Sequence, residues 1–328
     1  MKVLFIGGTG IISSACSQLA VDNGIDLFLL NRGKSSRPIP DSANVLIADF
    51  YDAGSVRSAL GSQRFDVVVD WIAYTPDRVE ADLELFRGRT DQYVLISSAS
   101  AYMTPPVSLP VTESTPLHNP FWEYSRNKIA CEERLIRAYR DEGFPITIVR
   151  PSHTYDRTSI PVHGGYTVID RMRKGKKIVV HGDGTTLWAL THHRDFAKGF
   201  VPLLGNNHAI GEVFHITSDE LLTWNAIVEL LAKAAGATAE IVHIPSGIIA
   251  RYDEWWGESL LGDKTHCMVF DNTKIKRVVP GFEATIPFAR GAEEIVAWYD
   301  ADPARQVVDE RVDGVTDQLV ERWESTWL

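Results

Sequence analysis

The chain has 328 residues, of which 45% are hydrophobic and 23% charged, and its formal net charge is −10. This length and composition are ordinary for a globular protein with one large domain or two closely packed lobes. The acidic balance disfavours nucleic-acid binding as the main role, and no apolar run is long enough to predict a membrane span.

Short apolar runs alternate with helical patterns through the first part of the chain. Buried strands are predicted at 3–6, 27–30, 45–47, 67–69, 93–96 and 146–149, and helical patterns such as 12–23 and 123–140 separate most of them. Continuous apolar strands between helices indicate a parallel sheet that helices cover on both faces. We therefore predict an α/β fold with a doubly wound parallel Rossmann sheet, a dinucleotide-binding domain over residues 1–150.

The pattern loosens after Pro151, and residues 151–328 predict a smaller C-terminal α/β substrate lobe, with some segments returning to the first domain. Helices are predicted at 194–204, 224–235 and 288–299, and strands at 177–180, 213–216 and 240–243. A last helix, docked on the body or on a partner, is predicted from the helical spacing of Val308, Val312, Val315, Leu319, Trp323 and Trp327.

Targeting and metal binding have no clear signal in the sequence. The first apolar run is too short for a signal-peptide core and no cleavage site follows it, so we expect a cytoplasmic protein. The cysteines Cys16, Cys131 and Cys267 are too scattered for a disulfide framework or a zinc site. No histidine pair has helical ligand spacing with a carboxylate nearby, and no metal site is predicted.

A glycine-rich turn follows the first predicted strand and opens the first predicted helix. Its glycines permit a tight turn and close approach of the backbone to a pyrophosphate, and the helix N-terminus favours that anion. Ser13 stands where a third glycine is usual and is small enough for close helix–strand packing. The turn predicts a dinucleotide site rather than an ordinary glycine turn, with binding residues Gly7, Thr9, Gly10, Ile11 and Ile12.

The segment after the second predicted strand bears on the choice of cofactor. It reads Asn31-Arg32-Gly33-Lys34 and lacks the acidic residue that usually holds the ribose 2′-hydroxyl of NAD. Arg32 could instead pair with a 2′-phosphate and stack on adenine, which favours NADP over NAD. The alternative is that Arg32 is a solvated loop charge.

The ends of the next two strands supply further cofactor-binding candidates. Asp49 can reach the adenine amino group and Phe50 can offer backbone contacts, while Asp52 is a candidate helix cap. Trp71 and Ala73 follow the fourth strand, where the chain passes the cofactor. Trp71 either shapes the floor of the pocket or packs in the core.

Tyr124 and Lys128 are four residues apart in a predicted helix, so their side chains share one face. A free tyrosine has a pKa of about 10, and a neighbouring cation favours the phenolate and lowers that pKa toward working pH. Ser98, at the end of a neighbouring strand, could hold a substrate hydroxyl or carbonyl against the phenol. These residues predict an acid/base site, against the alternative of a core aromatic and a strand cap.

Together these segments resemble the extended short-chain dehydrogenase/reductases of the NAD-dependent epimerase/dehydratase family. The matching pieces are residues 7–13, 96–102 and 124–128, with Arg150-Pro151 and 192–195 extending the resemblance. The resemblance implies that Ser98 and Tyr124 are catalytic and that Lys128 lowers the tyrosine pKa and binds the nicotinamide ribose. It also implies that Pro151 and Ser152 lie beside the carboxamide, that the cofactor is NAD(P), and that the chain forms a homodimer through the helix that carries Tyr124.

Departures from the family pattern narrow the reaction and the substrate. Ala99 and Ser100 follow Ser98 where the sugar dehydratases of the family carry an Asp-Glu pair, so 4,6-dehydration is disfavoured. Trp188 stands where nucleotide-sugar enzymes place an arginine for the diphosphate, and a tryptophan can instead stack on a sugar. His153 replaces the family's asparagine. We expect Ser98, Ser100, His153 and Trp188 to contact a small sugar-like substrate.

The predicted chemistry is proton removal by Tyr124 with hydride transfer to or from nicotinamide. Return of the hydride to the other face of the ketone gives an epimerase, whereas release of the ketone gives a dehydrogenase, or a reductase in reverse. The motifs are common to both reactions. A non-enzymatic alternative also stands, because the glycine turn and lobe features resemble chloroplast stem-loop RNA-binding proteins of the same fold. The acidic charge and the intact set of Ser98, Tyr124 and Lys128 argue against it.

Overall fold

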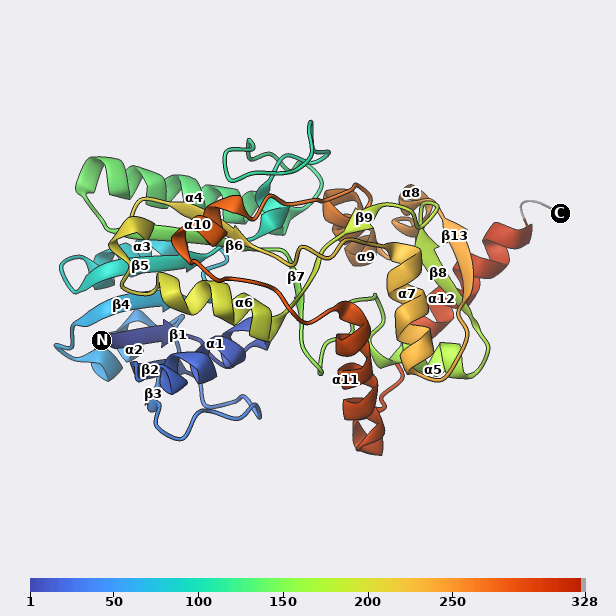
Figure 1. Ribbon diagram of the computed structural model, residues 1–328, viewed down its shortest axis with the longest axis horizontal. Helices are drawn as coiled ribbons and strands as arrows, with labels where there is room; N and C mark the ends of the chain where they lie inside the picture. Colours follow the sequence, from blue (N-terminus) through green and yellow to red (C-terminus); the bar gives the residue numbers. More distant parts are fainter. Residues whose placement is uncertain (326–328) are drawn as a thin grey trace.

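A seven-stranded parallel sheet organises the N-terminal part of the molecule (Figure 1), in a computed structural model that describes residues 1–325. The strand order is β11-β6-β5-β4-β1-β2-β3, and every neighbouring pair is parallel. The chain order reverses between β1 and β4, and ligands of open α/β sheets bind beyond the carboxyl ends of the strands at such a point. The predicted doubly wound parallel sheet is confirmed.

The strands of this sheet are β1 (Lys2–Ile6), β2 (Asp26–Asn31), β3 (Asn44–Ile47), β4 (Phe65–Asp70), β5 (Thr90–Ile96), β6 (Ile146–Pro151) and β11 (Val213–Ile216). Its helices are α1 (Ile11–Asp22), α2 (Ala53–Leu60), α3 (Pro76–Phe86), α4 (Glu123–Glu142), α6 (His193–Phe200) and α10 (Thr273–Val278). The segment 193–216 and helix α10 therefore return to the first part of the chain after it has entered the second.

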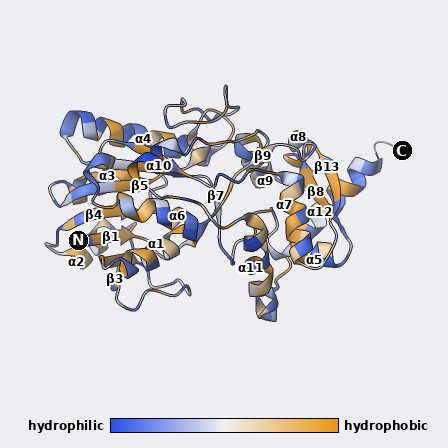
Figure 2. Cartoon of the chain, viewed as in Figure 1, coloured by the Kyte–Doolittle hydropathy of each residue, from blue (hydrophilic) through white to orange (hydrophobic). Residues whose placement is uncertain are grey.

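Both faces of the sheet are buried at its central strands, which are apolar at successive positions, whereas the edge strand β3 is mostly exposed. Val3 and Phe5 of β1 pack with α1 and α6, while Leu4 and Ile6 of the same strand pack with α2, α3 and α4. Successive strand side chains point to opposite faces, so a strand covered on both sides must be apolar throughout. The orange strands of Figure 2 show this continuous hydrophobicity.

The second lobe is built around a parallel pair of strands, β8 (Lys177–His181) and β13 (Glu240–Ile244). The helices of this part are α5 (Tyr166–Arg173), α7 (Trp224–Ala234), α8 (Ser246–Ile249), α9 (Glu254–Ser259), α11 (Phe288–Asp300) and α12 (Glu310–Ser325). The short strands β7 (His153–Tyr155), β9 (Leu187–Trp188), β10 (Leu190–His192) and β12 (Leu222–Thr223) lie where the chain crosses between the two parts. A π-helical turn, Leu260–Lys264, follows α9.

The predicted tail helix is α12, and it docks on the second lobe of its own chain. Leu319 and Val320 are buried in a cluster with Ile249 and Trp256. Arg171 of α5 forms ion pairs with Asp313 and Asp317 of α12, beside the apolar contact. Trp327, the last residue of the predicted apolar face, lies outside the described residues. None of the helices within residues 1–325 has the length and apolar character needed to cross a membrane.

Candidate active site

The glycine turn joins β1 to α1 in a conformation that only glycine adopts easily. Gly7 and Gly8 have φ angles of +102° and +100°, and a Cβ on Gly8 would meet Leu29 at 2.6 Å. Ser13 replaces the third glycine without loss of packing, because its hydroxyl accepts a hydrogen bond of 2.8 Å from the Gly10 N–H. The turn therefore leaves the backbone open at the N-terminus of α1, as the sequence predicts.

A cavity of about 300 Å³ lies beside this turn, at the carboxyl ends of β1 and β2. Its walls include Gly7, Thr9, Asn31, Arg32 and Phe50 among the predicted cofactor residues, together with Lys34 and Tyr51. No carboxylate belongs to the described wall. The amide Nδ2 of Asn31 is buried and has no hydrogen-bond partner among the described residues. We refer to this space as the adenosine cavity.

A second cavity, of about 250 Å³, continues along the glycine turn to the predicted catalytic residues. Gly10, Ile11, Ile12, Trp71, Tyr124, Lys128 and Pro151 all line it. The indole Nε1 of Trp71 is buried without a hydrogen-bond partner in the described chain, although the ring packs edge-on against Phe5 and Phe200. Both alternatives for Trp71 thus hold, since it belongs to the core and to the cavity wall.

Tyr124 also lines a third cavity, of about 490 Å³, which we call the catalytic cavity. Ser98, Ser100, Pro151, Ser152 and His153 lie in the same wall. Ser98 and Ser100 are held by a hydroxyl–hydroxyl hydrogen bond of 2.8 Å, and Ser125 of α4 donates to Ser100 at 2.8 Å. These bonds fix the end of β5 against the helix that carries Tyr124.

Helix α4 is anchored below the site by buried charge. Glu132 accepts a hydrogen bond of 2.5 Å from the Ser97 hydroxyl and forms an ion pair with Arg150 at the end of β6. The helix ends at Gly143, whose φ of +67° gives a left-handed cap. Tyr124 is thereby placed by a helix that is bonded to two neighbouring strands.

The ionisation of Tyr124 differs from the sequence expectation. Burial raises its pKa to about 12, and hydrogen bonding with the Ser98 side chain only partly opposes this effect. Lys128 does not point at the phenol oxygen: its ammonium donates to the carbonyls of Ala73 and Ile96, both at 2.8 Å. Burial lowers the pKa of Lys128 to about 8. The expected lowering of the tyrosine pKa by this lysine is therefore not seen in this arrangement.

Trp188 is placed differently from what the sequence suggests. It is 1% exposed and belongs to the wall of none of these cavities, so it has no open face on which a ligand could stack. Its Nε1 instead donates to Nδ1 of His153 at 3.1 Å. Burial lowers the pKa of His153 to about 3, so this ring is neutral at pH 7 with its proton on Nε2.

Two residues that were predicted to bind the cofactor, Ala73 and Asp49, do not line the two cavities beside the glycine turn. Ala73 is fully buried and presents its carbonyl to Lys128. Asp49 is exposed, caps the N–H of Tyr51 at 3.1 Å and does not line the adenosine cavity. Asp52, the alternative helix cap, accepts from the N–H groups of Gly54 and Ser55 at the start of α2.

Several wall residues were missed by sequence reasoning. Tyr74 lines both cofactor-side cavities, with its ring 6.2 Å from that of Tyr124, and Trp122 packs 5.1 Å from Tyr124 on the other side. Asp263 and Lys264 enter the catalytic cavity from the π-helical turn. The nearness of Tyr74 and Trp122 to known motifs could have indicated them, whereas nothing in the sequence brings residues 263–264 to this site.

Metal binding has no structural support within residues 1–325, where no group of three or more histidine, cysteine or acidic side chains is arranged to hold an ion. His192 and His193 are adjacent, but each is engaged separately. His192 lies 3.3 Å from Glu294, and His193 contacts the carbonyl of Ile11 at 3.2 Å.

Comparisons with known proteins support the fold and the family that the sequence motifs indicate. The chain is 31% identical over 258 residues to the chloroplast stem-loop binding protein of 41 kDa b of Arabidopsis thaliana, covering 74% of this chain but only 65% of that protein. It is 24% identical over 293 residues to the 2′-dehydrokanamycin reductase of Streptomyces kanamyceticus, covering 86% of this chain and 80% of the reductase.

Solved structures of epimerases superpose on most of the chain. The UDP-glucose 4-epimerase of Bifidobacterium longum, in complex with NAD+ and UDP, matches with a TM-score of 0.74 at 19% identity, covering 92% of this chain and 99% of that one. Epimerase Mth375 of Methanothermobacter thermautotrophicus matches with a TM-score of 0.75 at 17% identity, covering 93% and 94%. The NAD dependent epimerase/dehydratase family itself matches residues 3–217. The chain therefore belongs to the NAD-dependent epimerase/dehydratase family.

Proposed function

We propose that the protein is an NAD(P)-dependent enzyme that epimerises, oxidises or reduces a sugar-like alcohol or ketone. One observation carries the proposal: Tyr124 lines both the cavity that runs along the glycine turn and the catalytic cavity that contains Ser98. A phenol in that position can exchange a proton with a ligand in one space while the ligand faces a cofactor in the other.

The residues of the cofactor-side cavities fit a dinucleotide. The turn at Gly7 and Gly8 leaves backbone without side chains where a pyrophosphate would approach, and α1 directs its N-terminus there. The unpartnered donors on Asn31 and Trp71 lie where an adenosine and a nicotinamide half, respectively, would offer acceptors. A nicotinamide cofactor bound there supplies the hydride acceptor or donor.

The chain's own residues handle the proton and the geometry. Tyr124 takes the proton of a substrate hydroxyl as the carbinol hydrogen leaves as hydride, and returns it in the reverse direction. Ser98 lines the same cavity as Tyr124 and holds the substrate oxygen near the phenol. Lys128 fixes the segments at Ala73 and Ile96 and remains available for the cofactor ribose.

A Tyr124→Phe variant tests the acid/base role. Removing the phenolic proton should lower turnover by about 10² to 10⁴-fold while leaving the dissociation constant of the cofactor nearly unchanged. Turnover is followed by reduced-nicotinamide absorbance and by product analysis on a panel of free sugars, glycosides and nucleotide sugars. Tyr139→Phe, an exposed tyrosine on the same helix, is the matched control. Turnover by Tyr124→Phe at the wild-type rate would contradict the proposal.

The same panel separates the two reactions. Product formed with catalytic cofactor and no net change in reduced nicotinamide supports epimerisation, whereas stoichiometric reduction or oxidation of the cofactor supports a dehydrogenase or reductase. The motifs and the cavities are compatible with both reactions. The similar proteins include a reductase and an epimerase.

We further propose that NADP is preferred over NAD. Arg32 and Lys34 are exposed at the adenosine cavity, and no described wall residue offers a carboxylate to a ribose 2′-hydroxyl. Calorimetric dissociation constants for both cofactors test this preference, with Arg32→Ala expected to weaken NADP and spare NAD. The proposed preference is overturned if the wild type binds NAD more tightly than NADP. Two of the similar solved structures are complexes with NAD.

RNA binding is the second candidate, because the chloroplast relative named a stem-loop binding protein shares 31% identity with this chain. The net charge of −10 and the retained Ser98, Tyr124 and Lys128 argue against it. Filter retention of a stem-loop RNA at low and high salt discriminates the candidates, since phosphate-based binding falls steeply with salt. We expect no retention at either salt concentration.

A further inference from the structure

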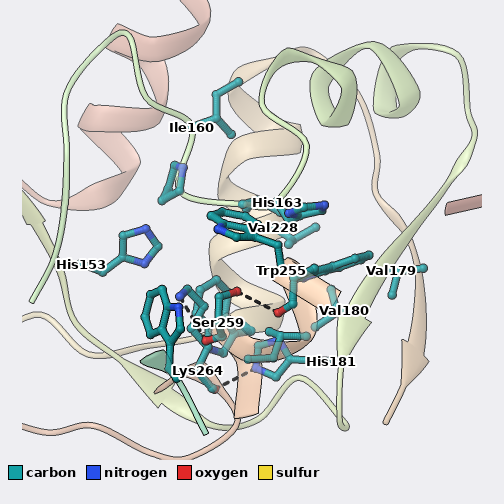
Figure 3. Close-up of a pocket in the computed structure, with 16 residues that line it drawn as sticks. His153, Ile160, His163, Val179, Val180, His181, Val228, Trp255, Ser259 and Lys264 are labelled. Atoms are coloured by element: carbon teal, nitrogen blue, oxygen red, sulfur yellow. Dashed lines mark hydrogen bonds between the residues drawn. The ribbon is translucent and has the colours of Figure 1, made fainter. Parts of the chain in front are cut away.

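A fourth cavity adjoins the catalytic cavity on the side of the C-terminal lobe (Figure 3). It has a volume of about 190 Å³ and shares the wall residues Trp122, His153, Trp255 and Lys264 with the catalytic cavity. We call it the aromatic chamber. Figure 3 shows His153 and Lys264 on one side of this space and Val179 and Val180 on the other.

The wall of the aromatic chamber is apolar or aromatic over most of its area. Trp224 and Val228 come from α7, Val179 and Val180 from β8, and Trp256 from α9. Trp256 stacks on His163 with ring centroids 4.3 Å apart and an interplanar angle of 11°. Trp255, which is 64% exposed, forms a rim that both cavities share. Such a wall favours flat or aliphatic groups.

Apart from Lys264, which the chamber shares with the catalytic cavity, the polar groups of the chamber wall are neutral. The indole Nε1 of Trp224 is buried and has no hydrogen-bond partner among the described residues. Nε2 of His163 makes no hydrogen bond either, but it lies 3.8 Å from the carboxylate of Asp253. Trp224 is only 4% exposed, so water cannot easily satisfy its N–H. Burial lowers the pKa of His163, and that of His181 to about 4, which keeps both rings uncharged at pH 7.

The charged residues in the described walls of the catalytic cavity and the aromatic chamber are the neighbours Asp263 and Lys264. Lys264 is the single lysine or arginine in the described wall of either cavity, and it lies 3.5 Å from the carboxylate of Asp263. Its ammonium also donates to the carbonyl of Ser259 at 3.4 Å and lies over the ring of Trp122. A diphosphate needs several cationic or N–H donors, and a lysine already neutralised by a carboxylate is a weak one.

We propose that the substrate is an uncharged sugar-like molecule that carries an aromatic or aliphatic substituent. Its sugar ring lies between Tyr124 and the pair of Asp263 and Lys264 in the catalytic cavity, and its substituent fills the aromatic chamber. Asp263 accepts from ring hydroxyls and Lys264 donates to them, while Trp224 donates to a polar atom of the substituent. This inference rests on the proposed function and specifies its substrate class.

Binding measurements on the full chain with saturating NADP test the inference without requiring turnover. The probes are 4-nitrophenyl β-D-glucopyranoside, methyl β-D-glucopyranoside and UDP-glucose, with the corresponding galactosides in parallel. Stacking of the nitrophenyl ring should make the aryl glycoside bind about three- to tenfold tighter than the methyl glycoside. UDP-glucose should bind no tighter than the methyl glycoside.

Two variants separate the chamber from the catalytic cavity. Trp255→Ala removes the aromatic rim at an exposed position, and Val228→Phe fills the chamber from α7. Both should abolish the preference for the aryl group and leave NADP binding unchanged. Val228→Phe should also leave methyl glycoside binding unchanged, because Val228 lines the chamber and not the catalytic cavity. Trp298→Ala is the control, because Trp298 lies on α11 against Arg305 and outside both cavities.

The inference is overturned if UDP-glucose binds more tightly than the glycosides, if the aryl group gives no gain, or if no probe of the glycoside class binds. It is also overturned if Trp255→Ala retains the full aryl preference. None of these outcomes touches the proposed function, which fails separately if Tyr124→Phe turns over at the wild-type rate.

Discussion

At the scale of a single residue, the burial of Lys128 disfavours the positive charge that its predicted role requires. The side chain is 1% exposed, and its ammonium is held by two backbone carbonyls rather than by a carboxylate. Burying a charge without a counter-ion is costly, which is why the pKa falls. The sequence could predict that Lys128 and Tyr124 share a helix face. It could not predict the direction of their pKa shifts, because the depth of burial depends on strands distant in the chain.

The cost of burying the Lys128 ammonium should appear in the pH dependence of the free energy of unfolding. Between pH about 8 and 10.5 the native chain has released the Lys128 proton while the unfolded chain still holds it. The unfolded state binds more protons in that window, so native stability rises with pH, by about 3 kcal/mol in total. A Lys128→Met variant lacks this gain. Urea unfolding across the window should show the wild type gaining stability relative to the variant.

The control for that experiment is Lys233→Met, at an exposed position on α7. Its unfolding free energy should run parallel to that of the wild type as the pH rises. A constant difference between wild type and Lys128→Met across the window would show that the ammonium is not destabilised by burial.

Trp188 acts on the site through His153. The indole donor fixes Nδ1 of His153 as an acceptor, so the ring offers an Nε2–H donor toward its surroundings. Trp188→Phe keeps an aromatic ring but removes that donor, and the tautomer is then no longer fixed. We expect KM for the substrate to rise about three- to tenfold with little change in kcat. Trp298→Phe is the control, and an equal fall in kcat and kcat/KM would assign Trp188 to the chemical step instead.

At the scale of elements, the segment between β2 and β3 links the two parts of the molecule. Arg37 of this segment forms an ion pair with Asp156 and donates to the Thr158 hydroxyl at 2.5 Å. Residues 32–35 of the same segment line the adenosine cavity, and Thr154 near the other end of the link lines the cavity that follows. The link therefore joins two segments that each line a cavity proposed for the cofactor.

Breaking this link should speed cofactor release. Arg37 is 25% and Asp156 2% exposed, so the pair is better shielded than a surface ion pair, for which about 1 kcal/mol is an upper value. Arg37→Ala should raise the dissociation rate of the cofactor about fivefold, measured by stopped-flow displacement. Arg57→Ala, which removes an exposed pair with Glu84, should leave the rate unchanged. Equal rates in both variants would show that the link does not retain the cofactor.

Helices and strands with a regular spacing of apolar residues were predictable from the sequence. Elements that form through tertiary contacts were not. The predicted strand 213–216 and helix 123–140 correspond to Val213–Ile216 and Glu123–Glu142. The two-residue strands β9 and β12 exist because they pair with each other across more than thirty residues of chain. The π-helical turn Leu260–Lys264 has no sequence period at all. Consequently most of the residues that line the cavities beside the glycine turn could be named from the sequence, whereas Asp263 and Lys264 in the wall of the catalytic cavity could not.

At the scale of the whole molecule, homodimer formation through α4 stays a prediction. Leu135 and Ala138 are fully buried in the core of their own chain, so they are not available to a partner. The outer surface of α3 and α4 carries ion pairs instead, between Arg134 and Glu80 and between Arg87 and Glu142. Charged residues are depleted at the centres of stable interfaces. A dimer through this face should thus be weak, and sedimentation velocity over a concentration series measures its dissociation.

The proposed division of cofactor and substrate binding between the two parts of the molecule can be tested through α12. This helix packs on the second lobe, where Leu319 is 1% exposed in a cluster with Trp256. Trp256 in turn stacks on His163 in the wall of the aromatic chamber. Leu319→Ala leaves a cavity in this cluster and should cost about 2 to 5 kcal/mol of stability. Because the cofactor cavities draw no wall residue from the cluster, the variant should lose glycoside affinity and keep its NADP affinity. Calorimetric titration of both ligands, with the exposed Glu321→Ala of the same helix as control, measures the two effects separately. A parallel loss of NADP affinity would mean that the lobes bind as one cooperative unit.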